Sequence, residues 1–130
     1  MMRYASRTSF VLRTALAVGL TLAGAARAEE STADLVRRGF TAAATQYGGL
    51  LSQVQSKPGF PRTVENGAVK LVGPHDWTSG FFPGSLWYLF EATGDAKWRA
   101  AAIDYTARTA PVKFDKTQHD LGFMLGAGYG

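Results

Sequence analysis

Apolar residues recur at spacings of three and four in residues 36–54, at Val36, Phe40, Ala43, Tyr47, Leu50 or Leu51, and Val54. This period is that of an α-helix with one apolar face, and such a face must be buried against other elements. Ser31 or Thr32 can cap the start of the helix. The Lys-Pro-Gly-Phe-Pro sequence at 57–61 ends it. The first constraint on the fold is therefore a long amphipathic helix that needs packing partners.

Three further helices are predicted after residue 76. One begins near Pro83, a residue suited to a first helical position, and ends before Gly94. Asp95 can cap the next helix, which Pro111 closes. A fourth begins around Asp120. The connections between these helices are short, so neighbouring helices should pack as antiparallel pairs.

Residues 62–76 are polar and irregular, although a short extended piece can form at 68–72. No segment of the chain shows a sustained two-residue alternation of apolar and polar side chains, which is the pattern of a half-buried strand. The predicted fold class is therefore all-α, built from helical hairpins.

Residues 1–28 have the composition of a secretory signal peptide. A basic opening precedes an apolar run at 14–26 that is too short to span a bilayer comfortably, and an A-x-A cleavage signal stands at 26–28. An uncleaved membrane anchor is the alternative. We predict cleavage after residue 28 and a periplasmic or secreted protein, whose mature chain, 29–130, has 130 − 28 = 102 residues.

Charge and cysteine content narrow the function classes. The leader contains four arginines and no acidic residue, so the mature chain has 14 − 4 = 10 basic residues against 10 acidic ones. This balance does not support a basic surface for nucleic acid. The absence of cysteine excludes a disulfide framework and thiolate chemistry. The stability of the domain must therefore come from packed apolar surface.

Two stretches differ from ordinary packing helices: HDWTSGFFPG at 75–84 and HDLGFMLGAGYG at 119–130. Each begins with one of the two histidines, then an aspartate, and each contains a Gly-Phe pair. If successive helices are antiparallel, a pair of helices returns the chain to the end of the bundle where it started. Trp77 and Asp120 are 120 − 77 = 43 residues apart, which is the length of one such pair, so both should lie at the same end of the helices. Glycine permits close approach of a ligand, helix N-termini favour an anionic group, and a Trp face suits a sugar ring. These features predict a pocket for a small, partly apolar, negatively charged ligand.

The sequence DWTSGFFPGSLWYLFEATGD, preceded by FPRTVENGAVKLV and followed by HDLGFM and YG, resembles the unsaturated glucuronyl hydrolases, glycoside hydrolase family 88. The resemblance covers roughly residues 35–130, and LGAGYG departs from it with smaller residues than the family pattern. It implies an (α/α)6 barrel of six helical hairpins. About a third of that barrel would be present, with 29–130 as the N-terminal part of a truncated catalytic domain.

The resemblance also implies an activity. Such enzymes remove a 4,5-unsaturated uronic acid from the non-reducing end of lyase-generated oligosaccharides, by hydration of the vinyl ether. It makes Asp120 an essential catalytic aspartate and places Trp77 against the sugar, with His119 favoured as a substrate contact. It implies no cofactor and no metal. The family's second aspartate, the general acid/base, would lie beyond Gly130.

Each of these residues also has a structural interpretation. Asp120 can be a helix N-cap, Trp77 a core residue, and His119 a surface residue or a hydrogen-bonding neighbour of Asp120. For Asp76, capping of the turn at Thr78 and Ser79 is favoured over a functional role.

The residues around the two stretches also permit roles without catalysis. The two other tryptophans, at 87 and 98, lie inside predicted helices and are expected to pack. The two His-Asp pairs offer ligands that zinc accepts, but not in the spacing of a zinc motif. A sugar-binding module without catalysis and an inactive truncated fragment are the main alternatives to an enzyme. The polysaccharide, its linkage and any sulfate preference are not indicated by these residues.

Overall fold

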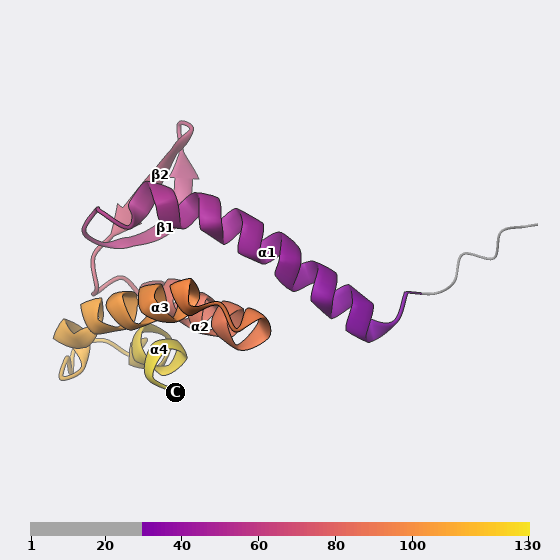
Figure 1. The fold of residues 1–130 in the computed structure, drawn as a ribbon. Helices are drawn as coiled ribbons and strands as arrows, with labels where there is room; N and C mark the ends of the chain where they lie inside the picture. Colours follow the sequence, from indigo (N-terminus) through magenta and orange to yellow (C-terminus); the bar gives the residue numbers. More distant parts are fainter. Residues whose placement is uncertain (1–29) are drawn as a thin grey trace, which may run out of the picture.

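The computed structural model describes residues 30–130, so the predicted leader lies outside the described residues. In chain order the elements are α1 (Thr32–Val54), β1 (Phe60–Glu65), β2 (Ala68–Val72), α2 (Phe81–Thr93), α3 (Ala96–Arg108), the 3-10 turn η1 (Ala110–Val112), the π-helical turn η2 (Gly122–Gly126) and α4 (Ala127–Tyr129). The described chain is mostly helical, as predicted (Figure 1).

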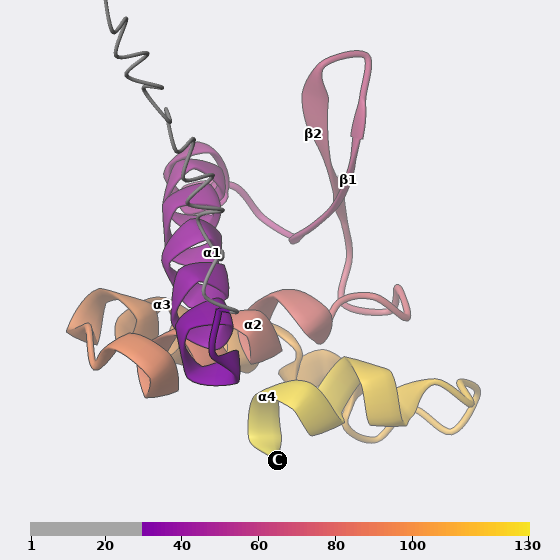
Figure 2. The same ribbon diagram turned by 90° about the vertical axis from the view of Figure 1, so that its right-hand side faces the viewer.

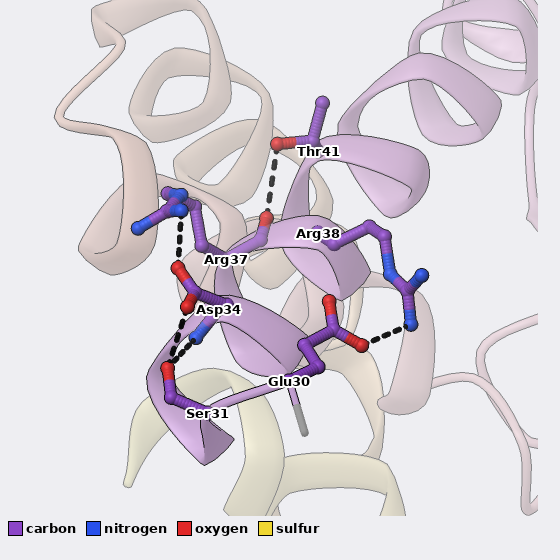
Figure 3. A network of polar contacts seen from close by, with 6 residues as sticks. All are labelled: Glu30, Ser31, Asp34, Arg37, Arg38 and Thr41. Atoms are coloured by element: carbon purple, nitrogen blue, oxygen red, sulfur yellow. Dashed lines mark hydrogen bonds and ion pairs between the residues drawn. The ribbon is translucent and has the colours of Figure 1, made fainter. Parts of the chain in front are cut away.

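Helix α1 begins with the predicted cap. The Ser31 hydroxyl accepts a hydrogen bond from the Asp34 amide at 3.1 Å. Around this cap lies a polar network of exposed residues, in which Arg37 pairs with Asp34, and Arg38 pairs with Glu30 at 2.7 Å (Figure 3). Exposed pairs of this kind contribute little to stability.

The apolar face of α1 contacts the rest of the molecule over the second part of the helix. Val54 is buried, and partly buried residues pack against the core at Phe40, Ala43, Ala44, Tyr47, Leu50 and Leu51. Val36, which was expected on this face, is instead half exposed. The prediction is wrong there because the first turns of α1 extend past the other helices (Figure 1).

An antiparallel β-hairpin connects α1 to α2. Its second strand, β2, is the extended piece expected at 68–72, but β1 was not predicted. Asn66 and Gly67 form the turn with φ values of 50° and 78°, as a tight type I′ hairpin requires. The pairing register shifts between Pro61 and Thr63, so β1 contains a bulge at Arg62.

Helices α2 and α3 form the central helical hairpin. Gly94, in the left-handed conformation at φ 68°, ends α2, and the Asp95 carboxylate accepts the Lys97 amide at 3.0 Å to cap α3. Helix α2 begins two residues before Pro83, so the proline lies in its first turn. The hairpin contributes most of the core: Phe82, Leu86, Leu89, Trp98, Ala102 and Tyr105 are buried together with Val54 and Phe60.

The two tryptophans expected to pack do so. Trp98 is buried, and the Trp87 indole Nε1 donates a hydrogen bond to the Thr106 hydroxyl at 3.1 Å. Within residues 30–130, no helix is both long and apolar enough to cross a bilayer.

The helical turns at 121–129 run parallel to α2, and Figure 2 shows them on one side of it. A side chain at Gly80 would meet the carbonyl oxygen of Phe123 at 2.0 Å, and one at Gly84 would meet Ala127 Cβ at 2.7 Å. Both contacts join residues 43 apart, since 123 − 80 = 43 and 127 − 84 = 43. The predicted up, down, up arrangement is therefore confirmed, and the backbones approach this closely because glycine has no side chain.

Candidate active site

Trp77 lies in the turn between β2 and α2, at the end of the molecule where α2 begins. Its indole is 45% exposed and makes edge contacts with Phe81 and Phe123, with ring centroids 5.8 and 6.3 Å apart. Phe81 and Phe123 are also partly exposed and lie 5.8 Å from each other. We call Trp77, Phe81 and Phe123 the aromatic rim. Trp77 is thus not a core residue, and the rim joins the two stretches singled out in the sequence.

A cleft of about 370 Å³ opens beside Trp77, within the size range of ligand pockets. It lies between α1, the β-hairpin and the start of α2, and its floor includes Tyr47 stacked on Phe82 at 5.7 Å. Its polar side chains include Arg62, Thr63 and Thr78. An apolar surface with a few polar groups at its edge suits one face of a sugar ring.

The turn that carries Trp77 is held by Asp76. One oxygen of its carboxylate accepts the Thr78 amide at 2.9 Å and the Thr78 hydroxyl at 2.6 Å. The other accepts a 2.6 Å bond from Arg62. Burial acts to raise the pKa of Asp76, but the Thr78 hydrogen bonds and the Arg62 charge outweigh it and hold the pKa below its usual value. The capping interpretation of Asp76 is confirmed at Thr78, whereas the Ser79 hydroxyl bonds the Pro74 carbonyl.

A second turn of the same kind precedes Asp120. Asp115 accepts the Thr117 amide at 2.8 Å and its hydroxyl at 2.6 Å, and these bonds lower the pKa of Asp115. Its other oxygen lies 3.1 Å from His75 Nδ1. His75 therefore ties the Trp77 turn to the loop that leads to Asp120. Asp115 was not among the predicted site residues, although the Asp-x-Thr pattern at 76–78 recurs at 115–117.

Asp120 directly precedes the helical turns at 121–129. Its carbonyl accepts the amides of Phe123 and Met124 at 2.9 and 3.2 Å. No backbone amide within residues 30–130 donates to its carboxylate, so the N-cap interpretation, in which helix amides bond to this charge, is wrong. The carboxylate is one-quarter exposed and lies 3.5 Å from His119 Nε2, and the His119 side chain is almost fully exposed.

The structure thus brings the two stretches together, although no hydrogen bond or aromatic contact in the described part of the chain joins Trp77 to Asp120 or His119. Trp77 reaches the Asp120 helix through Phe123. Asp120 and His119 lie outside the cleft that Trp77 lines. The site therefore consists of the aromatic rim and the His119–Asp120 pair, which lie at the same end of α2 and the turns at 121–129.

The chain was compared with protein families, with curated proteins and with solved structures. No protein-family model matches the chain. An unsaturated glucuronyl hydrolase of Formosa agariphila is 38% identical over 73 residues, which are 55% of this chain and 18% of that protein. Another, of Bacillus sp. strain GL1, is 40% identical over 70 residues, 50% of this chain and 18% of its own length. A crystal structure of an unsaturated glucuronyl hydrolase specific for heparin matches 75% of this chain and 26% of that one, at 41% identity and a TM-score of 0.64.

The chain is similar to the unsaturated glucuronyl hydrolases in sequence and in fold. It spans less than a fifth of the curated relatives that it matches. The predicted class, helical hairpins that form part of an (α/α)6 barrel, agrees with the mostly helical structure and with its likeness to an unsaturated glucuronyl hydrolase. In the part of the chain that the structure describes, no three His, Cys, Asp or Glu side chains gather where they can hold a metal ion.

Proposed function

We propose that this chain carries part of the active site of a glycoside hydrolase. The enzyme removes a 4,5-unsaturated uronic acid from the non-reducing end of lyase-generated oligosaccharides. The main support is the register of α2 and the turns at 121–129, which puts the Trp77 turn and Asp120 at one end of two parallel helices. The further support is that three quarters of the chain matches an unsaturated glucuronyl hydrolase structure at 41% identity.

The chemistry is hydration of a vinyl ether. A proton adds to C4, positive charge develops at C5 and the ring oxygen, and water adds at C5 with loss of a proton. The resulting C5 hemiketal opens by breaking its bond to the ring oxygen, which leaves a hemiacetal at C1. Collapse of that hemiacetal breaks the glycosidic bond and releases the remaining sugar. Asp120 orients the ring and stabilises the developing positive charge through its negative charge. The proton comes from a separate acid, for which no residue of this chain is assigned.

Trp77 and His119 bind the substrate in this proposal. Trp77 offers a half-exposed indole to the apolar face of the sugar ring, and the rest of the aromatic rim extends that surface. His119 is exposed and adjacent to the Asp120 carboxylate, so its imidazole can donate a hydrogen bond to a hydroxyl or carboxylate of the sugar. The partner is an unsaturated oligosaccharide, and no cofactor takes part. The proposal includes export to the periplasm or the medium.

Asp120→Asn tests the catalytic role, because it keeps the size of the side chain and removes its charge. In protein expressed from its complete gene, we expect kcat to fall by at least about a hundredfold, the effect of losing one electrostatic stabiliser. The assay is the loss of the ultraviolet absorbance of the C4=C5 bond. A heparin-derived unsaturated disaccharide is the first substrate to try, since the similar crystal structure is of an enzyme specific for heparin.

Asp34→Asn is the matched control, because it removes the same charge at an exposed helix start outside the rim. It should turn over substrate at the parental rate. A parental rate for Asp120→Asn would show that Asp120 is not catalytic. If the unaltered protein binds the disaccharide but leaves its absorbance intact, the sugar-binding alternative replaces the enzyme.

A further inference from the structure

Arg62 is the extra residue of the bulge in β1. Pro61 pairs with Leu71 and Thr63 pairs with Lys70, so two neighbouring residues of β2 face two residues of β1 that are separated by Arg62. A bulge bends its strand and changes the direction of the bulged side chain, and bulges are common beside active sites. Here the Arg62 guanidinium reaches Asp76, 14 residues later in the chain, at 2.6 Å.

The Asp76 carboxylate uses both of its oxygens at this point. One binds Arg62, and the other binds the amide and hydroxyl of Thr78. Trp77 lies between Asp76 and Thr78 in the chain, so it is the middle residue of this hydrogen-bonded turn. The indole is 45% exposed and contacts Phe81 and Phe123 in T-shaped geometry, whereas the Asp76 side chain is only 16% exposed. The position of the indole therefore depends strongly on how firmly residues 76–78 are held.

Arg62 also lines the cleft, where a free guanidinium would favour an anionic group on a ligand. Arg62 is the only charged side chain among the lining residues, and Asp76 already neutralises it. The pair as a whole carries no net charge, and its geometry joins the hairpin to the Trp77 turn. The arrangement thus favours a role in which Arg62 holds the Trp77 turn against the hairpin over a role in binding an anionic ligand.

We propose that Arg62 and Asp76 are positioning residues that fix the indole of Trp77 at the aromatic rim. We call this contact the Arg62–Asp76 brace. It sets the angle at which the indole meets a sugar ring, and that part rests on the proposed function. The brace holds one side of the Trp77 turn through the hairpin, while Phe81 and Phe123 contact the indole from the helices.

Fluorine NMR of protein labelled with 5-fluorotryptophan tests the brace without reference to activity. The chain has three tryptophans, and Trp77→Phe identifies the signal of Trp77. In Arg62→Gln we expect this signal to shift by more than its linewidth or to broaden, with the signals of Trp87 and Trp98 unchanged. Asp76→Asn should displace the same signal. The double variant should add little, because one lost partner already breaks the brace.

Arg38→Gln is the control, because Arg38 forms a comparable 2.7 Å pair with Glu30 at the start of α1. It should leave all three signals in place. A Trp77 signal that stays at its original position and width in both Arg62→Gln and Asp76→Asn overturns the brace.

Kinetics supply the second readout. Arg62→Gln should raise KM for an unsaturated disaccharide by about three- to tenfold, the net effect of one ordinary hydrogen bond, and change kcat less. Arg62→Lys should restore part of the loss. Failure of the unaltered protein to hydrolyse any unsaturated uronide would overturn the proposed function and leave the fluorine prediction in force.

Discussion

Gly80→Ala tests the contact that sets the distance between the start of α2 and the turns at 121–129. A Cβ at this position would lie 2.0 Å from the carbonyl oxygen of Phe123 and 2.6 Å from that of Met124, where ordinary contacts begin at 3.4 Å. Both neighbours are backbone atoms, so no side-chain rotation relieves the overlap. The turns at 121–129 must move away from α2 by about 3.4 − 2.0 = 1.4 Å.

The backbone at Gly80 is otherwise compatible with alanine, because its φ and ψ of −80° and −19° are ordinary helical values. The cost is therefore steric alone. Overpacking of this kind costs about 1–3 kcal/mol and occasionally more, and we expect the upper end because two carbonyls are struck. Urea unfolding of protein expressed from its complete gene measures this loss.

The same displacement moves Asp120 relative to Trp77. A misplacement of about 1 Å can reduce turnover by up to about a hundredfold, so kcat/KM should fall together with stability. Gly49→Ala is the matched control, because a Cβ there meets nothing within 4 Å and lies inside α1. It should be neutral or stabilise by up to about 1 kcal/mol. A Gly80→Ala protein as stable and active as Gly49→Ala would refute the reasoning.

Two further predictions concern the rim and the leader. Trp77→Ala should raise KM for an unsaturated disaccharide more than it lowers kcat, because stacking acts on the bound substrate and the transition state alike; an unchanged KM would return Trp77 to a packing role. Exported protein should begin near Glu29 when its N-terminus is sequenced, and a chain still starting at Met1 would contradict export.

The helical framework was predictable from the sequence because its signals are local. Ser31 and Asp95 cap their helices as expected, and Gly94 ends α2 in the left-handed conformation that favours glycine. The 43-residue register followed from short connections alone and is confirmed at Gly80 and Gly84. These features depend on a few neighbouring residues, so tertiary contacts did not override them.

The first strand of the hairpin, β1, was missed because it lacks the strand period. The strand β1 has its only buried residue at Phe60, and its remaining residues are exposed or partly exposed without alternation, so the usual strand period is absent. The Asn66-Gly67 pair was the available signal, because these residue types favour the positive φ values of a tight hairpin turn. Because β1 was not predicted, the Arg62–Asp76 contact could not be predicted from the sequence either.

The second Asp-Thr turn and the environment of Asp120 show the same limit. Asp115 meets His75 only because the fold brings residues 40 positions apart together. Asp120 has the sequence context of an N-cap, yet its carbonyl alone receives the amides of the first turn. The helix there opens with π-helical geometry at Gly122–Gly126, which cap rules for regular α-helices do not anticipate.

Distance and orientation at the rim have different physical origins. Glycines 80 and 84 set how close α2 and the turns at 121–129 approach, because any side chain there would strike the opposite backbone or Ala127. Asp76 and Asp115 set the conformation of the connecting loops, because each carboxylate accepts the amide and the hydroxyl of the threonine two residues later. A glycine substitution should therefore change stability and activity together, whereas loss of an aspartate contact should reorient one loop on an intact helical core. The separation of these two effects is what makes the fluorine signal of Trp77 informative when the unfolding curve does not move.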